Sequence, residues 1–199
     1  MESVEKSIFN DFVKKTFGED FDNGLSPESK EILIAKSHIL KLDKGEFLQI
    51  EGDISKYWGY VSSGLVRVYY MHNGEEITEQ LAIDGDGFFD CESFFKQTPS
   101  DRFIQMLEPT TLYLFRRMEY GEVIMQNPEI RRFFRYLTEM ILLMKKKRTL
   151  DSIFQSAKER YETLLAEKPN LVLRAPSNII ASYLGITPET LSRIKSKKK

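Results

Sequence analysis

The chain has 199 residues, of which 41% are hydrophobic and 30% charged, so its composition supports a packed core and excludes global disorder. Its single cysteine, Cys91, excludes an internal disulfide and a cysteine-rich metal centre, which favours a reduced, cytoplasmic protein. The first residues carry charges throughout, and no apolar run approaches the roughly 18–20 residues of a membrane span. Neither a secretory signal nor a membrane partner is therefore expected.

The net charge of −1 conceals an asymmetry along the chain. From Lys145 onward, 13 Lys and Arg stand against 5 Asp and Glu, whereas the preceding part holds 16 basic and 25 acidic residues. A basic C-terminal part indicates contact with a polyanion such as nucleic acid. The alternative is a solvated basic tail, because the final KSKKK supplies half of the excess.

Two short helices are predicted before the first strand. Residues 3–17 place apolar side chains near helical spacing. A second helix is predicted from Ser26, which can cap it, through Pro27 at its first position, to about Lys36.

Residues 37–117 change to short apolar runs rich in β-branched and aromatic residues, which predicts an antiparallel β-roll. The clearest hairpin runs from Leu65–His72 through Asn73-Gly74 to Glu75–Ile83, because Asn-Gly adopts the positive φ angles of a tight turn. Cys91–Lys96 is expected to form a helical turn, followed by strands over 103–107 and 111–115. The runs are separated by glycines at positions 45, 52, 59, 64, 74, 85 and 87.

A long helix is predicted from Pro128 to about Arg148, followed by a second helix over about 151–167. Its large apolar residues recur at alternating steps of three and four, a seam suited to a partner helix and hence to a homodimer. The alternative is that the same stripe packs on the roll. The seam residues are Ile130, Phe133, Leu137, Met140 and Met144.

The segment Ala175–Lys199 predicts a helix-turn-helix. A first helix opens at Pro176-Ser177, Gly185 occupies the tight turn, and Thr187 caps the second helix with Pro188 at its first position. In such a pair, the second helix enters the DNA major groove and reads bases near its N-terminus.

The second helix carries side chains suited to reading bases. Glu189 can accept from cytosine and Arg193 can donate twice to guanine, while Ser192 can reach a base or a phosphate. The alternative for Glu189 and Arg193 is an intrahelical salt bridge. Residues suited to phosphate contacts are Thr190, Lys195, Lys197, Lys198 and Lys199.

The sequence resembles the CRP/FNR family over nearly its whole length. The resemblance is carried by KGEFLQIEGD and YVSSGLVRVYY in the roll, by the helix after Pro128 and by IASYLGITPETLSRI. In that family, a glutamate, a residue three positions on and the following arginine read DNA; these positions fall on Glu189, Ser192 and Arg193. The pattern Glu-Thr-x-Ser-Arg is nearer to the FNR half of the family.

The resemblance implies an α+β fold: an N-terminal cyclic-nucleotide-binding-like antiparallel β-roll, a long dimerisation helix and a small C-terminal helix-turn-helix domain without an evident terminal wing. The expected boundaries are 1–127 for the effector-sensing roll and its preceding helices, 128–148 for the dimerisation helix and 149–199 for the DNA-binding domain. The implied function is transcription regulation on double-stranded DNA as a homodimer, with RNA polymerase as a further partner.

The candidate effector pocket departs from the cyclic-nucleotide pattern of the family. There, a Phe-Gly-Glu segment holds the ribose and Arg-Ser-Ala the cyclic phosphate. By register, Phe89 stands at the glycine, Asp90 near the glutamate, and Ser100 and Asp101 at the arginine and serine. Arg102 could take the place of the phosphate-binding arginine only if the loop is shifted by two residues relative to the family pattern. No cofactor is therefore expected and cAMP is disfavoured, while another small effector or no effector is left open.

Other classes of function lack the residues that they require. An iron–sulfur cluster needs more cysteines than Cys91. His38 and His72 form no His-x-His pair for a metal enzyme or an evident haem site. No phosphate-binding loop, nucleophile elbow or dinucleotide fingerprint is present, so an enzyme is not expected. The nearer alternative is a small-ligand or cyclic-nucleotide signalling module without DNA binding, against which the C-terminal motif argues.

Overall fold

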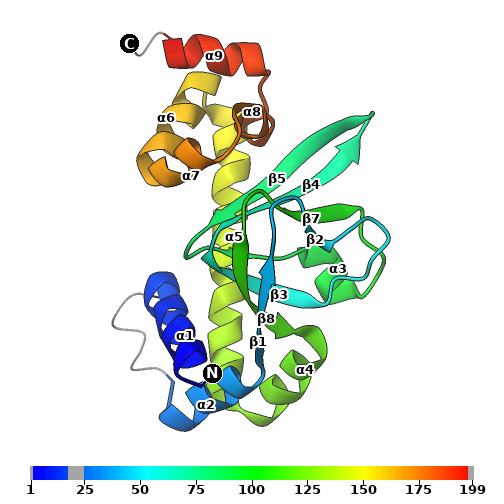
Figure 1. Ribbon diagram of the computed structural model, residues 1–199, viewed down its shortest axis with the longest axis vertical. Coiled ribbons are helices and arrows are strands. Elements are labelled where there is room, and N and C mark those ends of the chain that lie inside the picture. The colour runs from blue at the N-terminus through cyan, green and yellow to red at the C-terminus, as the bar shows by residue number, and fades with distance from the viewer. Residues whose placement is uncertain (1, 18–24, 197–199) are drawn as a thin grey trace.

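The computed structural model describes residues 2–17 and 25–196 (Figure 1). A β-roll lies against one side of a long helix, α5 (Pro128–Phe154), whose two ends carry separate groups of helices. One group precedes or follows the roll: α1 (Glu2–Phe17), α2 (Pro27–Ala35) and α4 (Arg117–Gln126). The other group ends the chain: α6 (Ala157–Glu167), α7 (Pro169–Arg174), α8 (Ser177–Leu184) and α9 (Pro188–Ser196). This arrangement confirms the predicted α+β fold class.

The roll consists of two four-stranded antiparallel sheets, with strand orders β1-β8-β3-β6 and β2-β7-β4-β5. Side chains from both sheets close over an apolar interior that includes Val61, Val66 and Leu112. A short helix, α3 (Cys91–Lys96), interrupts the roll as predicted. The strands are β1 (Ser37–Leu42), β2 (Phe47–Gln49), β3 (Tyr57–Ser63), β4 (Leu65–His72), β5 (Glu75–Ile83), β6 (Gly87–Phe88), β7 (Arg102–Met106) and β8 (Thr110–Arg116).

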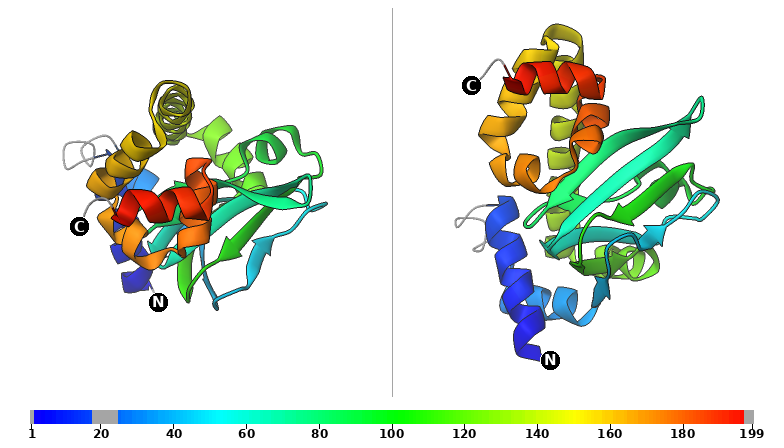
Figure 2. Two further views of the ribbon diagram at one scale, coloured as in Figure 1. Left: turned by 90° about the horizontal axis from the view of Figure 1, so that it is seen from above. Right: turned by 45° about the horizontal axis from the view of Figure 1, so that its top comes forward.

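The Asn-Gly hairpin forms with the predicted bounds. His72 faces Glu75 in the ladder, and the turn residues Asn73 and Gly74 have φ angles of 51° and 82°. Both values lie in the left-handed region that a two-residue primed turn requires. The resulting β4–β5 ribbon projects from the roll beside the C-terminal helices (Figure 2).

The long helix extends further than its sequence pattern indicated. We expected it to end near Arg148 and a new helix to begin near Asp151, but α5 continues to Phe154 and α6 begins at Ala157. The predicted break was wrong because residues 148–154 contain neither glycine nor proline. The new helix begins where Ser156 and Glu159 form a reciprocal capping box.

The first half of α5 is buried in an aromatic core that it shares with the roll and the N-terminal helices. Phe12 of α1 lies edge-on to Phe133 at a ring-centroid distance of 5.8 Å, and Phe134 packs edge-on against Phe115 of β8. Glu129 fastens α2 to the same half of α5, since its Oε2 accepts hydrogen bonds from the hydroxyls of Ser26 and Ser29. These hydrogen bonds lower the pKa of Glu129 to about 2.

The C-terminal helices pack on the roll rather than standing apart from it. Leu65 and Leu81 of the β4–β5 ribbon join a core with Leu171 and Ile180 of the C-terminal helices. Arg174 pairs with acidic side chains of the roll and donates to the carbonyl of Gly64 at 2.7 Å. The DNA-binding candidate is thus attached to the roll by apolar and charged contacts together.

Within the described residues, no helix combines the length and the apolar character needed to cross a membrane.

Candidate nucleic-acid interface and effector pocket

Helices α8 and α9 are joined by a tight turn in the segment for which a helix-turn-helix is predicted. Gly185 ends α8 with φ 65°, and the amide of Ile186 donates to the carbonyl of Ala181 at 3.0 Å. The amide of Thr190 then donates to Thr187 Oγ1 at 3.2 Å, so Thr187 caps α9 as expected. Ala181 is fully buried, and its small side chain lets the two helices approach closely. In Figure 2, α9 crosses the end of the molecule that is remote from the N-terminus.

One face of α9 is buried and the opposite face is open. Leu191 packs into the core of the C-terminal helices, with Ile194 half-buried beside it. Glu189, Ser192 and Arg193 are all exposed on the other face. The structure therefore brings the three predicted base-reading residues together, near the start of the helix.

Arg193 and Glu189 make local contacts at the start of α9, and both side chains keep their charge on the exposed face. Arg193 Nη2 donates to Thr190 Oγ1 at 3.2 Å. The backbone amide of Glu189 and the hydroxyl of Thr187 lower the pKa of the Glu189 carboxyl, so it is ionised at neutral pH. Ser196 is exposed one turn beyond Ser192. The sequence analysis did not single it out, although its i+4 spacing from Ser192 was a usable signal.

The candidate phosphate-contacting residues have different surroundings. Lys195 Nζ lies 2.9 Å from Ser177 Oγ, so it joins α9 to the first turn of α8. Thr190 is half-buried, and its hydroxyl bonds with Thr187 and Arg193. Lys197, Lys198 and Lys199 lie outside the described residues.

The predicted dimer seam is mostly interior. Ile130, Phe133 and Leu137 are 0%, 1% and 3% exposed, because they pack against the roll and α1. For these three residues the dimer prediction was wrong and the alternative, packing on the roll, is correct. Of the remaining pair, Met140 is half-buried and Met144 is 52% exposed.

A different face of α5 carries exposed apolar side chains. We call it the α5 stripe, and its members are 43–79% exposed. Positions 143 and 150 are seven residues apart and 153 follows three residues later, so the three side chains share one face of α5, on the side away from the buried set; the exposed Lys146 and Lys147 lie between them in the sequence. The α5 stripe consists of Leu142, Leu143, Leu150, Ile153 and Phe154.

The candidate effector pocket brings Asp90 and Ser100 together, but they satisfy each other. Both side chains are buried, and Ser100 Oγ donates to Asp90 Oδ2. Asp90 also accepts from Gln49 Nε2 at 3.1 Å and caps α3 through the amide of Ser93. A side chain committed to this many internal bonds is poorly placed to hold a sugar hydroxyl.

Arg102 lies close to this pair and is engaged as well. Its amide donates to Ser100 Oγ at 2.8 Å, while its guanidinium pairs with Glu79 and with the exposed Asp101. The structure thus gathers Asp90, Ser100 and Arg102, with Asp101 on the outer side. The sequence analysis missed Glu79, which comes from a strand 23 residues earlier.

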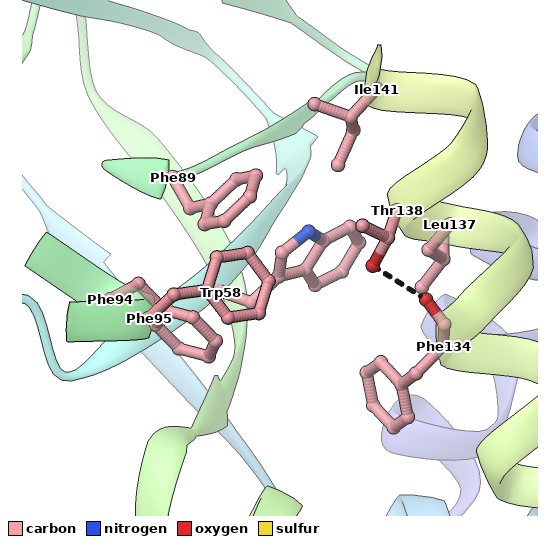
Figure 3. A pocket seen from close by; sticks show the side chains of 8 residues that line it. All are labelled: Trp58, Phe89, Phe94, Phe95, Phe134, Leu137, Thr138 and Ile141. Carbon is pink, nitrogen blue, oxygen red and sulfur yellow. Dashed lines mark hydrogen bonds between the residues drawn. The ribbon is translucent and has the colours of Figure 1, made fainter. Parts of the chain in front are cut away.

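Phe89 belongs to an aromatic pocket between the roll and α5 (Figure 3). The cavity holds about 10 Å³, room for about one water molecule. Trp58 lines it, and its Nε1 is buried without a hydrogen-bond partner among the described residues. The other lining residues are Phe89, Phe94, Phe95, Phe134, Leu137, Thr138 and Ile141.

The remaining candidate ligands do not converge. His38 Nε2 lies 3.2 Å from Glu119 Oε2, and the ring of His72 lies 3.4 Å from the side-chain amide of its neighbour Asn73. Burial raises the pKa of the Cys91 thiol. In the part of the chain that the structure describes, no group of three or more His, Cys, Asp or Glu side chains is placed to hold a metal ion.

Residues 39–127 match the family model of the cyclic nucleotide-binding domain. The match spans most of the β-roll, together with α4. No curated protein sequence matches the chain significantly. Solved structures share the fold of the domain together with its helices. FixK2 from Bradyrhizobium japonicum superposes with a TM-score of 0.70 at 23% identity, covering 81% of this chain and 83% of that one.

Two further structures extend the comparison. A CooA mutant from Carboxydothermus hydrogenoformans gives a TM-score of 0.63 at 21% identity, with 90% of this chain and 82% of that one covered. The catabolite activator protein of Thermus thermophilus gives 0.55 at 22% identity, with 87% and 84% covered. The predicted CRP/FNR architecture is confirmed at the level of fold, with the cyclic nucleotide-binding domain in front of the C-terminal helices.

We expect the β-roll of this chain not to bind cAMP tightly. A cyclic phosphate needs a free cationic fork, but Arg102 already pairs with Glu79 and Asp101. Phe89 is 5% exposed and brings a bulky ring to the place where the family pattern has glycine. Calorimetric titration measures this directly, and a micromolar or tighter dissociation constant for cAMP would contradict the expectation.

Proposed function

We propose that the chain is a sequence-specific DNA-binding transcription regulator of the CRP/FNR type that acts as a homodimer without a requirement for cAMP. The fold is that of the CRP/FNR regulators, which supports a regulatory rather than an enzymatic role. The observation that carries the proposal is the open face of α9, where Glu189, Ser192 and Arg193 stand together on a helix-turn-helix.

The chemistry of that face fits a major groove. A recognition helix places the residues of its first turns against base edges, where a carboxylate accepts from cytosine and a guanidinium donates to guanine. The charge of the C-terminal part, with 13 basic and 5 acidic residues from Lys145 onward, favours approach to the phosphate backbone. Lysines 195 and 197–199 supply charge beyond the base-reading turn.

The α5 stripe supports a dimer. Five large apolar side chains on one exposed helix face form a patch of the kind that soluble proteins cover with a partner. A second copy of the same helix, related by a two-fold axis, would bury this face against itself. The resulting dimer carries two copies of α9, one for each of two inverted half-sites. The family resemblance implies RNA polymerase as a further partner.

Selection of bound duplexes from a random pool tests this proposal. We expect enrichment of an inverted repeat whose half-site centres lie about 10–10.5 base pairs apart, or a multiple of that spacing, because two symmetric readers must meet the same side of the DNA. The control protein carries alanine at Glu189, Ser192 and Arg193, all exposed, so that its fold is kept. Equal enrichment by the control, or no enrichment by the unmodified protein, would favour a signalling module without DNA binding.

A further inference from the structure

The carboxylate of Glu79 lies between two cations that come from different elements. Its Oε2 accepts from Arg102 Nε of β7 at 2.9 Å, and its Oε1 accepts from Lys145 Nζ of α5 at 2.6 Å. Glu79 itself belongs to β5. Each carboxylate oxygen thus binds one cation, and the two contacts join both strands of the roll to the long helix.

The surroundings strengthen these contacts. The side chains of Arg102, Glu79 and Lys145 are 25%, 29% and 44% exposed, so water screens them only in part. Burial opposes ionisation of Glu79, but the hydrogen bonds and charges of Lys145 and Arg102 outweigh it and lower the pKa of the carboxyl. Arg102 is held further by Asp101 and by the ring of Tyr70, 4.8 Å from its guanidinium carbon.

Two cations that converge on a two-oxygen anion form an arrangement that also binds small oxyanions. Without the Glu79 side chain, the Nε edge of Arg102 and the ammonium of Lys145 would face the same space. We propose that Glu79 is an intramolecular ligand that occupies an oxyanion site of the phosphate class, and so joins the roll to α5 without a diffusible effector. The regulatory meaning of this site rests on the proposed function; the site itself does not.

The same site lies next to Arg148, which joins α5 to α8 of the candidate DNA-binding unit. Lys145 lies one turn before Arg148 on α5, and Thr78 precedes Glu79 on β5. Arg148 Nη2 donates to the carbonyls of Thr78 at 3.2 Å and of Tyr183 in α8 at 3.0 Å, and its guanidinium lies over the Tyr183 ring. Through these residues, the occupied oxyanion site fixes the end of α5 that also positions α8.

The test replaces Glu79 by alanine in the full chain and uses inorganic phosphate as the probe, at constant ionic strength balanced with chloride. Trp58 is the sole tryptophan and lies between the roll and α5, so its fluorescence reports the junction. We expect Glu79→Ala to lower the Tm. Phosphate should then raise it saturably by about 3–6 °C at roughly ten times its Kd, with a parallel change in fluorescence.

The unmodified protein and Glu75→Gln serve as controls. Glu75 is exposed at the start of the same strand, and we expect both proteins to show only the small, non-saturating stabilisation that phosphate gives to proteins generally. A parallel titration with cAMP separates the two sources of the ligand group. A response to phosphate alone indicates the free ion, and a stronger response to cAMP indicates a phosphodiester.

Two outcomes would overturn the proposal. In one, the unmodified protein responds to phosphate as Glu79→Ala does, which means that Glu79 does not occupy the site. In the other, the variant shows no saturable response. If Glu79→Ala does not fold, Glu79→Ser also vacates the space between the two cations, and it must show the same response. No readout uses DNA, so a phosphate response in a protein that fails to bind DNA would leave this inference standing while ending the proposed function.

Discussion

Alanine at Arg193 is expected to weaken binding to the preferred duplex by roughly 1–3 kcal/mol per half-site and to relax the choice at one base pair. The side chain is exposed on the open face of α9, where its guanidinium donates a hydrogen bond to Thr190. Its removal deletes a bidentate donor to guanine without disturbing the core. Binding of the variant to preferred and scrambled duplexes at several salt concentrations measures both effects.

A matched set of variants separates base reading from charge. Lys14→Ala removes one exposed positive charge from α1 and should leave base preference unchanged. Replacing Lys197, Lys198 and Lys199 should weaken binding about equally on all sequences. It should also flatten the salt slope by up to about one unit for each DNA phosphate that the protein no longer neutralises. An Arg193→Ala protein with intact base preference would refute the role given to this residue.

Glutamate at both Leu143 and Leu150 is expected to convert the proposed dimer into monomers. In a symmetric dimer that buries the α5 stripe, both leucines of each copy lie in the interface, so each dimer gains four carboxylates and loses four buried leucine side chains. With roughly 1.5–3 kcal/mol for each leucine, the dissociation constant should rise by at least ~10³-fold. Light scattering at micromolar concentration measures the change, and DNA binding should fall with it.

Two further variants serve as controls for this experiment. Leu173→Glu makes the same exchange at a leucine of α7 that is 82% exposed and off the stripe, so it should leave the dimer intact. Leu137→Glu puts a charge into the aromatic core, where the side chain is 3% exposed, and should unfold the chain rather than release a monomer. A monomeric unmodified protein at micromolar concentration would contradict the proposed dimer.

Turn residues and helix-capping residues allowed much of the fold to be predicted from the sequence. Asn73-Gly74 determined a two-residue hairpin, and the register of β4 and β5 followed from it. Gly185 and Thr187 likewise determined where α8 ends and α9 begins. In contrast, α4 and α7 carry no clear apolar period, and neither was predicted.

Local sequence patterns predicted the open face of α9 and the roll, but no local pattern predicted which elements pack against α5. Helical spacing indicated that Ile130, Phe133 and Leu137 are buried against another structural element. It could not distinguish the chain's own roll from a second copy, because either partner satisfies the same period.

The state of the effector pocket was also decided by tertiary structure. Register placed Asp90 and Ser100 near one another, yet Arg102 pairs with Glu79 as well as with its neighbour Asp101, and the other partner of Glu79, Lys145, lies 66 positions away on α5. The sequence by itself therefore determined the roll, its clearest hairpin, and α9 with its open face, since these depend on local backbone preferences and periodicity. Only the tertiary structure decided which apolar face is left for a partner and which cations already have one, because burial and ion pairing depend on distances between segments far apart in the chain.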